Sequence, residues 1–251
     1  MQIFHIFNLS IEQWLWIMVA AFFIGFSKTG ISAFSMPAIP IIATVFGGKE
    51  STGVILPILL VGDIFALYYY NRHAKLNNIK KLLPSALIGI ILGVIVGNYI
   101  SDKQFKAVIA ISVLICLITL IYTEKKGDNL KVPQNTFFYS LTGITCGFTS
   151  MIGNAAGPIF SVYLLATGFK KNDFMGTTAW FFFLINLFKL PLQVLFWHNI
   201  SIKTIFLTFS MVPAIAIGAV LGVLIIKKLN EKLFRSIILA VTAIAAIRLF
   251  I

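Results

Sequence analysis

The stretch GFSKTGISAFSMP at residues 25–37 decides how this chain can fold. It places one lysine, four hydroxyl residues and two glycines between apolar segments. A lysine at membrane depth costs between about 3 and more than 10 kcal/mol unless it is paired or hydrated. A second stretch, GFTSMIGNAAGP at 147–158, has the same polar and glycine-rich character. Both stretches therefore predict interruptions in helices, between residues 26 and 31 and between residues 152 and 155, at which a polar site is expected.

The composition predicts the setting of these two stretches. Of the 251 residues, 59% are apolar and only 11% are charged, which is too few charges for a soluble domain of this size. Several segments reach the roughly 20 apolar residues that cross about 30 Å of hydrocarbon. The chain is therefore predicted to be an all-α, polytopic helical membrane protein. Its net charge of +12 lies in short loops beside the apolar segments, which excludes a nucleic-acid partner.

An internal repeat relates the two stretches. The matching positions, at offsets of 121 to 125 residues, are Gly25-Phe26 with Gly147-Phe148, Pro37 with Pro158, NIKK (78–81) with SIKT (201–204), and LGVIVG (92–97) with IGAVLG (217–222). The first repeat is predicted to span residues 1–127, with a broken-helix hairpin at 11–46 followed by three transmembrane helices. The second repeat is predicted to span 128–251, with a hairpin at 136–168 and three helices. Corresponding interruptions in two halves are typical of a transporter site.

The distribution of charge predicts an inverted arrangement. A hairpin contributes an even number of crossings, so three further helices make each half odd and invert the second half. Thirteen of the 20 basic residues then fall on one side and five on the other, with Lys28 and Lys189 inside the membrane. The positive-inside rule favours this arrangement. It predicts a cell (plasma or inner) membrane protein with both termini on the non-cytoplasmic side.

Few ionisable residues lie deep inside apolar segments. Asp63 occurs in LVGDIFAL, and the residue 123 positions later is Asn186. Asn186 and Lys189 share a helix face because they are three residues apart, and Pro191 weakens that helix just beyond them. Three alternative interpretations stay open. Lys28 could extend to an interface, Lys189 could only neutralise Asp63, and the small residues could serve close helix packing.

The interruptions supply donors for an anion. Short helices that begin there would expose unpaired N–H groups, and two inverted copies would direct them at the bilayer midplane. The predicted substrate-binding residues are Ser27, Lys28, Thr29, Gly30, Ser32, Thr149, Ser150, Gly153, Asn154, Ala155, Asn186 and Lys189, with Asp63 as a proton-coupling group or ion-pair partner. Neither a nucleophile–base pair, a metal-ligand spacing nor a P-loop occurs, so no enzyme, metal or cofactor is predicted.

The paired motifs GFSKTG…MP and GFTSMIGNAAGP, each opening one half of the chain, resemble the TauE/SafE family of membrane permeases, the sulfite exporters. The resemblance covers nearly the whole chain. The family usually has a denser glycine run where this chain has GNAAG at 153–157 and GISAFSMP at 30–37. The resemblance implies small sulfur-containing anions, such as sulfite, sulfoacetate or related organosulfonates, as substrates. Other members of this broad group are linked to uptake.

The sequence thus predicts a secondary transporter of a small sulfur-containing anion, working by alternating access. Export is favoured, because moving one negative charge outward through an inside-negative potential gains about 2.3 kcal/mol per 100 mV. Two alternatives remain: transport of another solute or in the uptake direction, and an intramembrane enzyme or scaffold. The expected partners are the anion and the lipid bilayer, with proton coupling as an option and the oligomeric state left open.

Overall fold

The computed structural model describes residues 9–35, 37–101, 104, 136–154, 156–230, 232–234, 236–237 and 240, and within these residues it contains helices and no strand. The elements are α1 (Ile11–Thr29), η2 (Ser32–Ser35), α2 (Ala38–Phe46), α3 (Gly48–Tyr70), η3 (Asn71–His73), α4 (Leu76–Tyr99), α6 (Thr136–Gly153), α7 (Ala156–Ala166), α8 (Lys171–Leu192), η5 (Gln193–Trp197) and α9 (Ile202–Lys228). The predicted all-α class is confirmed in this part of the chain.

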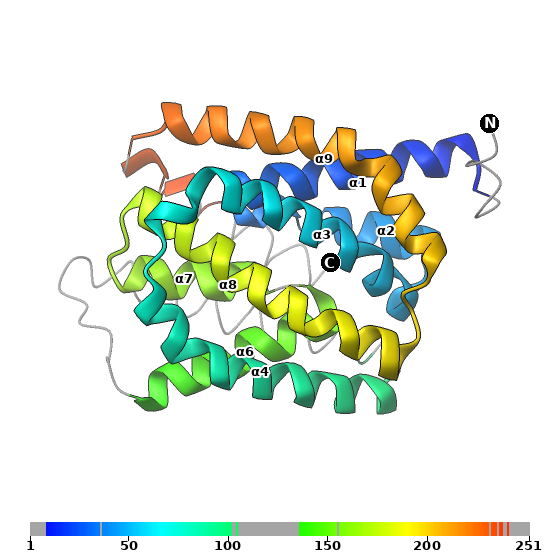
Figure 1. The fold of residues 1–251 in the computed structure, drawn as a ribbon, viewed down its shortest axis with the longest axis horizontal. Helices are drawn as coiled ribbons and strands as arrows, with labels where there is room; N and C mark the ends of the chain where they lie inside the picture. The colour runs from blue at the N-terminus through cyan, green and yellow to red at the C-terminus, as the bar shows by residue number, and fades with distance from the viewer. Residues whose placement is uncertain are drawn as a thin grey trace.

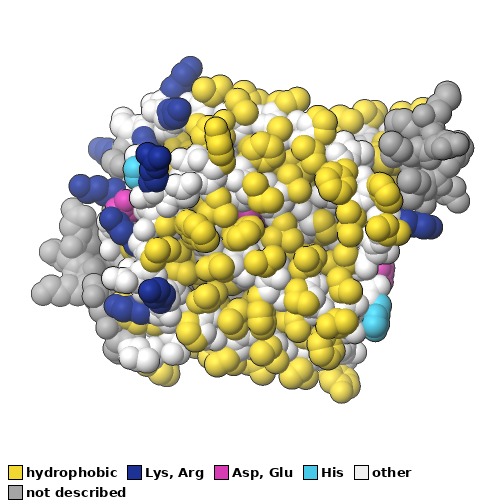
Figure 2. Space-filling view, viewed as in Figure 1, with side chains coloured by type: hydrophobic (Ala, Val, Ile, Leu, Met, Phe, Trp, Pro, Cys, Tyr) yellow, Lys and Arg dark blue, Asp and Glu magenta, His cyan; other side chains and the backbone are white. Residues whose placement is uncertain are grey.

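Four of the described helical stretches are long and apolar enough to cross a membrane. They are Lys49–His73, Leu76–Tyr99, Lys171–Trp197 and Ile202–Lys228. Space-filling Figure 2 shows the apolar side chains covering the middle of the visible face, with charged residues at its two ends. The predicted third helix of each half, at 104–123 and 233–250, lies almost entirely outside the described residues.

The helices pack in three groups. Figure 1 shows α1 alongside α9 on one side of the molecule and α4 alongside α6 on the other, with α3 and α8 between them. Glycines permit the two outer crossings. A Cβ added at Gly25 would lie 2.9 Å from the Cα of Ile215, and one at Gly147 would lie 3.0 Å from the Cα of Ala86. Each crossing therefore brings two backbones into direct contact, as small residues allow in membrane helices.

Two hairpins reach into the molecule from opposite ends. In the first, α2 returns toward the start of α1, since Ile42 shares a buried cluster with Trp14. In the second, α7 returns toward the start of α6, with the rings of Tyr139 and Tyr163 centred 6.2 Å apart. At 1.5 Å per residue, the 9-residue α2 and the 11-residue α7 are about half as long as the hydrocarbon is thick. Neither helix alone is therefore long enough to cross the hydrocarbon.

The first interruption differs from the predicted one. Ser10 caps the N-terminus of α1 through a reciprocal pair of bonds with Gln13, and the helix continues to Thr29. The break then runs from Gly30 to Pro37, later than the predicted position between 26 and 31. Consequently Ser27, Lys28 and Thr29 lie in the last turn of α1 and not at the N-terminus of a short helix.

The second interruption falls where the sequence predicts it, between 152 and 155. Helix α6 ends at Gly153, and Asn154 adopts a left-handed conformation with φ 52°. Asparagine tolerates this region better than most non-glycine residues, because its short side chain bonds locally. Farther along, α8 ends at Leu192, directly after Pro191, and continues as the π-helical turn η5. The predicted weakening of that helix beyond Lys189 is confirmed.

The two ends of the helical bundle differ in charge. At one end, which we call the basic end, the start of α8 meets the α3–α4 connection through the ion pair of Lys75 with Asp173 (3.0 Å). At the other, the Lys49 end, Lys49 donates to Asn98 Oδ1 (2.9 Å) and accepts from Asn199 through its backbone oxygen (3.0 Å). Figure 2 shows Lys and Arg side chains gathered mainly at one of these ends. Helices α3 and α8 run antiparallel between the two.

Candidate functional site

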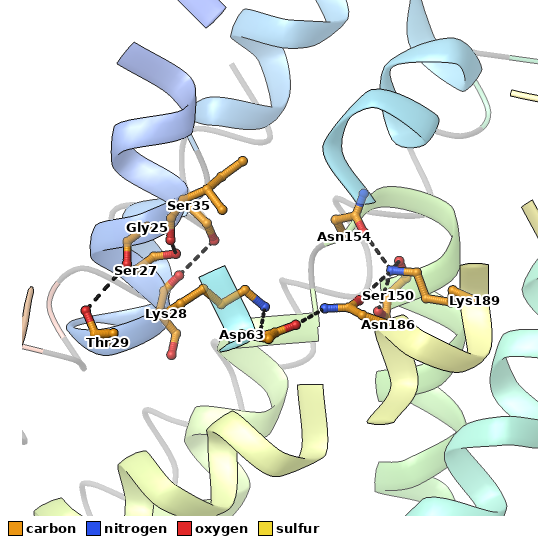
Figure 3. Close-up of polar contacts among 12 residues, drawn as sticks. Gly25, Ser27, Lys28, Thr29, Ser35, Asp63, Ser150, Asn154, Asn186 and Lys189 are labelled. Atoms are coloured by element: carbon orange, nitrogen blue, oxygen red, sulfur yellow. Dashed lines mark hydrogen bonds and ion pairs between the residues drawn. The ribbon is translucent and has the colours of Figure 1, made fainter. Parts of the chain in front are cut away.

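A buried polar chain connects three helices in the middle of the molecule (Figure 3). Lys28 of α1 forms an ion pair with Asp63 of α3, with Nζ 2.7 Å from Oδ1. The other carboxylate oxygen of Asp63 accepts a hydrogen bond from Asn186 of α8 at 2.7 Å. The Asp63 side chain has no exposed surface, and that of Lys28 is 11% exposed. The carboxylate is therefore held by a cation on one side and an amide on the other.

Lys189 extends this chain toward the second hairpin. Its Nζ donates to the Asn186 amide oxygen at 3.1 Å and to Asn154 Oδ1 at 2.7 Å. It also donates to Ser150, at 3.0 Å to the backbone oxygen and 3.1 Å to the hydroxyl. Lys189 is completely buried. Among the described residues its ammonium group has neutral oxygen partners and no ion pair with a carboxylate.

A small cavity lies beside this chain, where the two hairpins meet. It is lined by Ser27, Lys28, Ser32, Ser35, Leu59, Asp63, Ser150, Asn154, Gly157, Thr178, Ala179, Phe182 and Asn186. The cavity volume is about 30 Å³ when measured as the space that water centres can occupy, which is enough for two or three waters. Gly157 brings the second hairpin close to Ser32 of the first, since an added Cβ would lie 3.6 Å from that of Ser32.

Seven of the predicted residues gather at this cavity, and Lys189 is bonded to three of them. The seven predicted residues that line the cavity are Ser27, Lys28, Ser32, Asp63, Ser150, Asn154 and Asn186. This arrangement also bears on two alternative interpretations from the sequence, namely that Lys28 extends to an interface and that Lys189 only neutralises Asp63. Lys28 is paired with Asp63 inside the molecule, and Asn186 stands between Asp63 and Lys189.

Four other predicted residues do not line the cavity. The hydroxyl of Thr29 donates to the backbone oxygen of Ala219 in α9 at 2.6 Å, and that of Thr149 donates within α6 to Thr145 at 2.7 Å. Gly30 packs against α9, where its added Cβ would lie 3.2 Å from the Cα of Gly222. Gly153 is buried in the last turn of α6. Ala155, the remaining predicted residue, lies outside the described residues.

The sequence reasoning missed several residues of the cavity wall. Thr178 and Phe182 precede Asn186 by eight and four residues, so helical periodicity places all three on one face of α8. The Lys28 ammonium lies 4.9 Å from the centre of the Phe182 ring, a cation–π distance. Ser35 belongs to the first polar stretch itself. Extending the face of Asn186 by two turns would have identified the two residues on α8.

The charges of this cluster do not cancel. With all three groups ionised, Lys28 and Lys189 carry two positive charges and Asp63 carries one negative charge, so the cluster is positive by one. Two positions near the cavity also lack partners: within the described chain, the Asn154 amide nitrogen and the Thr178 hydroxyl make no hydrogen bond. Buried donors of this kind are normally satisfied by water or a ligand. The site can therefore accept an anion of small size.

Comparison with known proteins identifies the family of the chain. A family model described as sulfite exporter TauE/SafE matches residues 17–249. No curated protein and no solved structure matches the chain significantly. The family match covers almost the whole sequence, including most of the first hairpin, all of the second, α3, α8 and every residue of the cavity wall. The chain therefore belongs to the TauE/SafE family of sulfite exporters and is a multi-pass membrane transporter.

Proposed function

We propose that this protein exports a small sulfur-containing anion, sulfite or an organosulfonate, as a secondary transporter working by alternating access. The observation that carries the proposal is the buried cluster of Lys28, Asp63 and Lys189, which has two cationic groups and one anionic group and lies beside a cavity at the meeting point of two hairpins. A buried charge without a counter-charge is costly. A monovalent anion in the cavity would neutralise the cluster.

Lys189 is the cation that this anion would compensate. The charge of Lys28 is already balanced by Asp63, whereas Lys189 has only neutral oxygen partners among the described residues. Two unit charges 4 Å apart interact by about 4 kcal/mol at an effective dielectric constant of 20. Ser32 and the amide nitrogen of Asn154 would supply neutral donors to the remaining anion oxygens. Specificity for a small oxyanion would follow from the limited volume of the cavity.

The proposed alternation uses two inverted repeats, 1–127 and 128–251. In these repeats α1 corresponds to α6, and α4 corresponds to α9. The contact of α1 with α9 therefore corresponds to the contact of α6 with α4, which supports the repeat. The hydrogen bond between Asp63 and Asn186 supports it as well. These residues are 123 positions apart, so corresponding positions of the two halves meet each other. Movement of either hairpin away from this contact would open the cavity to one end of the molecule.

We place the basic end of the bundle in the cytoplasm of a cell whose inner or plasma membrane holds the protein. The described basic residues support this placement, since Arg72, Lys75, Lys170 and Lys171 belong to the basic end. Both termini would then lie outside the cytoplasm. An inside-negative potential favours outward movement of the anion by about 2.3 kcal/mol per charge and 100 mV. Export therefore requires no coupled ion.

A specific observation favours one alternative, proton-coupled uptake. Asp63 faces the cavity between Lys28 of α1 and Asn186 of α8, with Lys189 one hydrogen bond farther on. A proton on Asp63 would release Lys28, so that both cations could bind the anion. Binding would then strengthen as the pH falls, and the proton would travel with the anion. An inward proton gradient would drive the two inward together.

Flux in proteoliposomes distinguishes these modes. Sulfite-loaded vesicles receive either a membrane potential or a proton gradient, each imposed alone, and the wild type is compared with Asp63→Asn. For export without coupling, the potential alone drives sulfite and the Asp63→Asn protein still responds to it. For coupled uptake, the proton gradient drives the wild type, and Asp63→Asn loses that response. Asp173→Asn is the matched control, because this carboxylate pairs with Lys75 at the basic end, far from the cavity.

Binding by the purified protein tests the substrate class. Sulfite should raise the melting temperature in detergent, whereas choline, a cation of similar size, should not. A protein that responds to neither sulfite nor organosulfonates, and that moves neither in vesicles, would contradict the proposed function.

A further inference from the structure

Gln193 is the most unusual buried polar residue outside the cavity wall. Its side chain has no exposed surface. Within the described part of the chain, neither its amide nitrogen nor its amide oxygen has a hydrogen-bond partner. Leaving a buried donor or acceptor unpaired costs about 1–3 kcal/mol for each group. Such a residue in a native protein indicates that something else, such as water or a ligand, fills its bonding capacity.

The position of Gln193 relates it to the central cluster. It follows Lys189 by four residues and Asn186 by seven, so helical periodicity places the three side chains on one face of the continuous helix formed by α8 and η5. All three are buried. Gln193 is also the first residue of the π-helical turn η5, which follows Pro191. This turn ends the helix at Trp197.

The same face leads on to the Lys49 end of the molecule. Trp197, four residues beyond Gln193, is buried, and its ring lies 5.1 Å from the Nζ of Lys49. Nearby, Asn199 donates to Thr52 at 2.9 Å, while within the described residues its amide oxygen has no partner. One cation, Lys189, thus lies four residues before Gln193, and a second, Lys49 of α3, contacts Trp197 four residues after it.

We propose that Gln193 is a transient binding station for the transported anion, between the central cluster and the Lys49 end. Its amide nitrogen would donate to an anion oxygen, and its amide oxygen would accept from a water that accompanies the anion. This inference rests on the proposed function and adds a step to it. A neutral amide suits such a station, because it binds an anion weakly enough to release it toward Lys49.

Gln193→Met provides the test, since methionine keeps the length of the side chain and removes both amide groups. No hydrogen bond of the described structure is lost, so the melting temperature should stay the same or rise. Equilibrium sulfite binding should change less than about twofold, because the Lys189 site is intact. Sulfite flux in proteoliposomes should fall about tenfold, as expected for one lost hydrogen bond on the path at 1.4 kcal/mol per tenfold.

Gln193→Glu is the second variant. It keeps the shape of glutamine and adds a negative charge that repels the anion, so its flux should fall below that of Gln193→Met. Thr208→Val is the control, because this buried hydroxyl of α9 donates within its own helix, to Thr204 at 2.9 Å, and has no other hydrogen bond among the described residues. Its flux should match that of the wild type.

Each contrary result has a distinct meaning. Unchanged flux in Gln193→Met, with normal wild-type flux, overturns the station and leaves the proposed function standing. A clearly lower melting temperature of Gln193→Met also overturns the station, since it shows that the amide is satisfied structurally. A wild-type protein that moves no sulfite overturns both proposals.

Discussion

The two hairpin tips approach the same cavity with different chemistry. The first brings its own cation, Lys28, at the end of α1, and the neighbouring α3 supplies the carboxylate of Asp63. The second brings only neutral groups, Ser150 and Asn154, and the neighbouring α8 supplies the cation Lys189. One side of the cluster is therefore internally neutral, and the other retains a charge. The two interruptions are similar in sequence, but the excess positive charge lies beside the second hairpin.

The backbone of the two tips differs as well. The first break extends from Gly30 to Pro37 and contains the 3₁₀ turn η2. The second is formed around Asn154, in a left-handed conformation, and α7 follows almost at once. The shorter break holds the Asn154 amide oxygen within 2.7 Å of the Lys189 ammonium. The longer break leaves Ser32 and Ser35 on the cavity wall without fixing them to a cation.

Replacing Lys189 should have the largest effect on binding. Lys189→Met removes a positive charge that no carboxylate of the described residues balances, together with the donor to Ser150 and Asn154. One charge-assisted hydrogen bond contributes about 1.5–3 kcal/mol, so sulfite affinity should fall about 100-fold. Calorimetric titration of the purified protein measures this. Lys80→Met, on the exposed surface of α4, is the control. Equal affinities of the Lys189 variant and the wild type would contradict the assignment of the charge.

Removing the Lys28–Asp63 pair as a whole should have an intermediate effect. The double variant Lys28→Met with Asp63→Asn keeps the net charge of the cluster at one positive charge. Its sulfite affinity should stay within about tenfold of the wild type, because neutral replacement of a buried ion pair costs far less than breaking it. Lys28→Met alone should lose more, since Asp63 then repels the anion. If the double variant bound no better than Lys28→Met, the two charges would not act as a pair.

The smallest effects are expected at Thr29 and Thr149. Thr29→Val removes the hydrogen bond to Ala219 in α9, and Thr149→Val removes one within α6. A buried hydrogen bond contributes about 1 kcal/mol, so thermal unfolding should detect a modest loss, larger at Thr29, where two helices are joined. Sulfite affinity should not change in either variant. A clear loss of affinity in either variant would show that its hydroxyl takes part in sulfite binding.

Local signals explain which predictions from the sequence succeed. Composition identified the helical membrane class, and glycine, asparagine and proline marked the interruptions. The second break was located correctly because Gly153 and Asn154 end a helix whatever packs around it. The first was predicted too early, because Ser27, Lys28 and Thr29 are polar but still compatible with a helix. The hydroxyls of Ser27 and Thr29 bond back to carbonyl oxygens of the preceding turn, as that of Ser27 does to Ile24 at 2.8 Å.

The amino-acid sequence alone indicates that four polar residues inside apolar segments need polar partners from the protein, since hydrocarbon offers none. They are Lys28, Asp63, Asn186 and Lys189. The sequence also determines that Asn186 and Lys189 share a face, because helical periodicity is a local property. The packing of the helices determines that Lys28, and not Lys189, forms the ion pair with Asp63. It also determines that the Thr29 hydroxyl donates to Ala219 of α9. The physical reason is that an ion pair forms between whichever groups the helix packing brings within about 4 Å, and packing joins residues far apart in the chain.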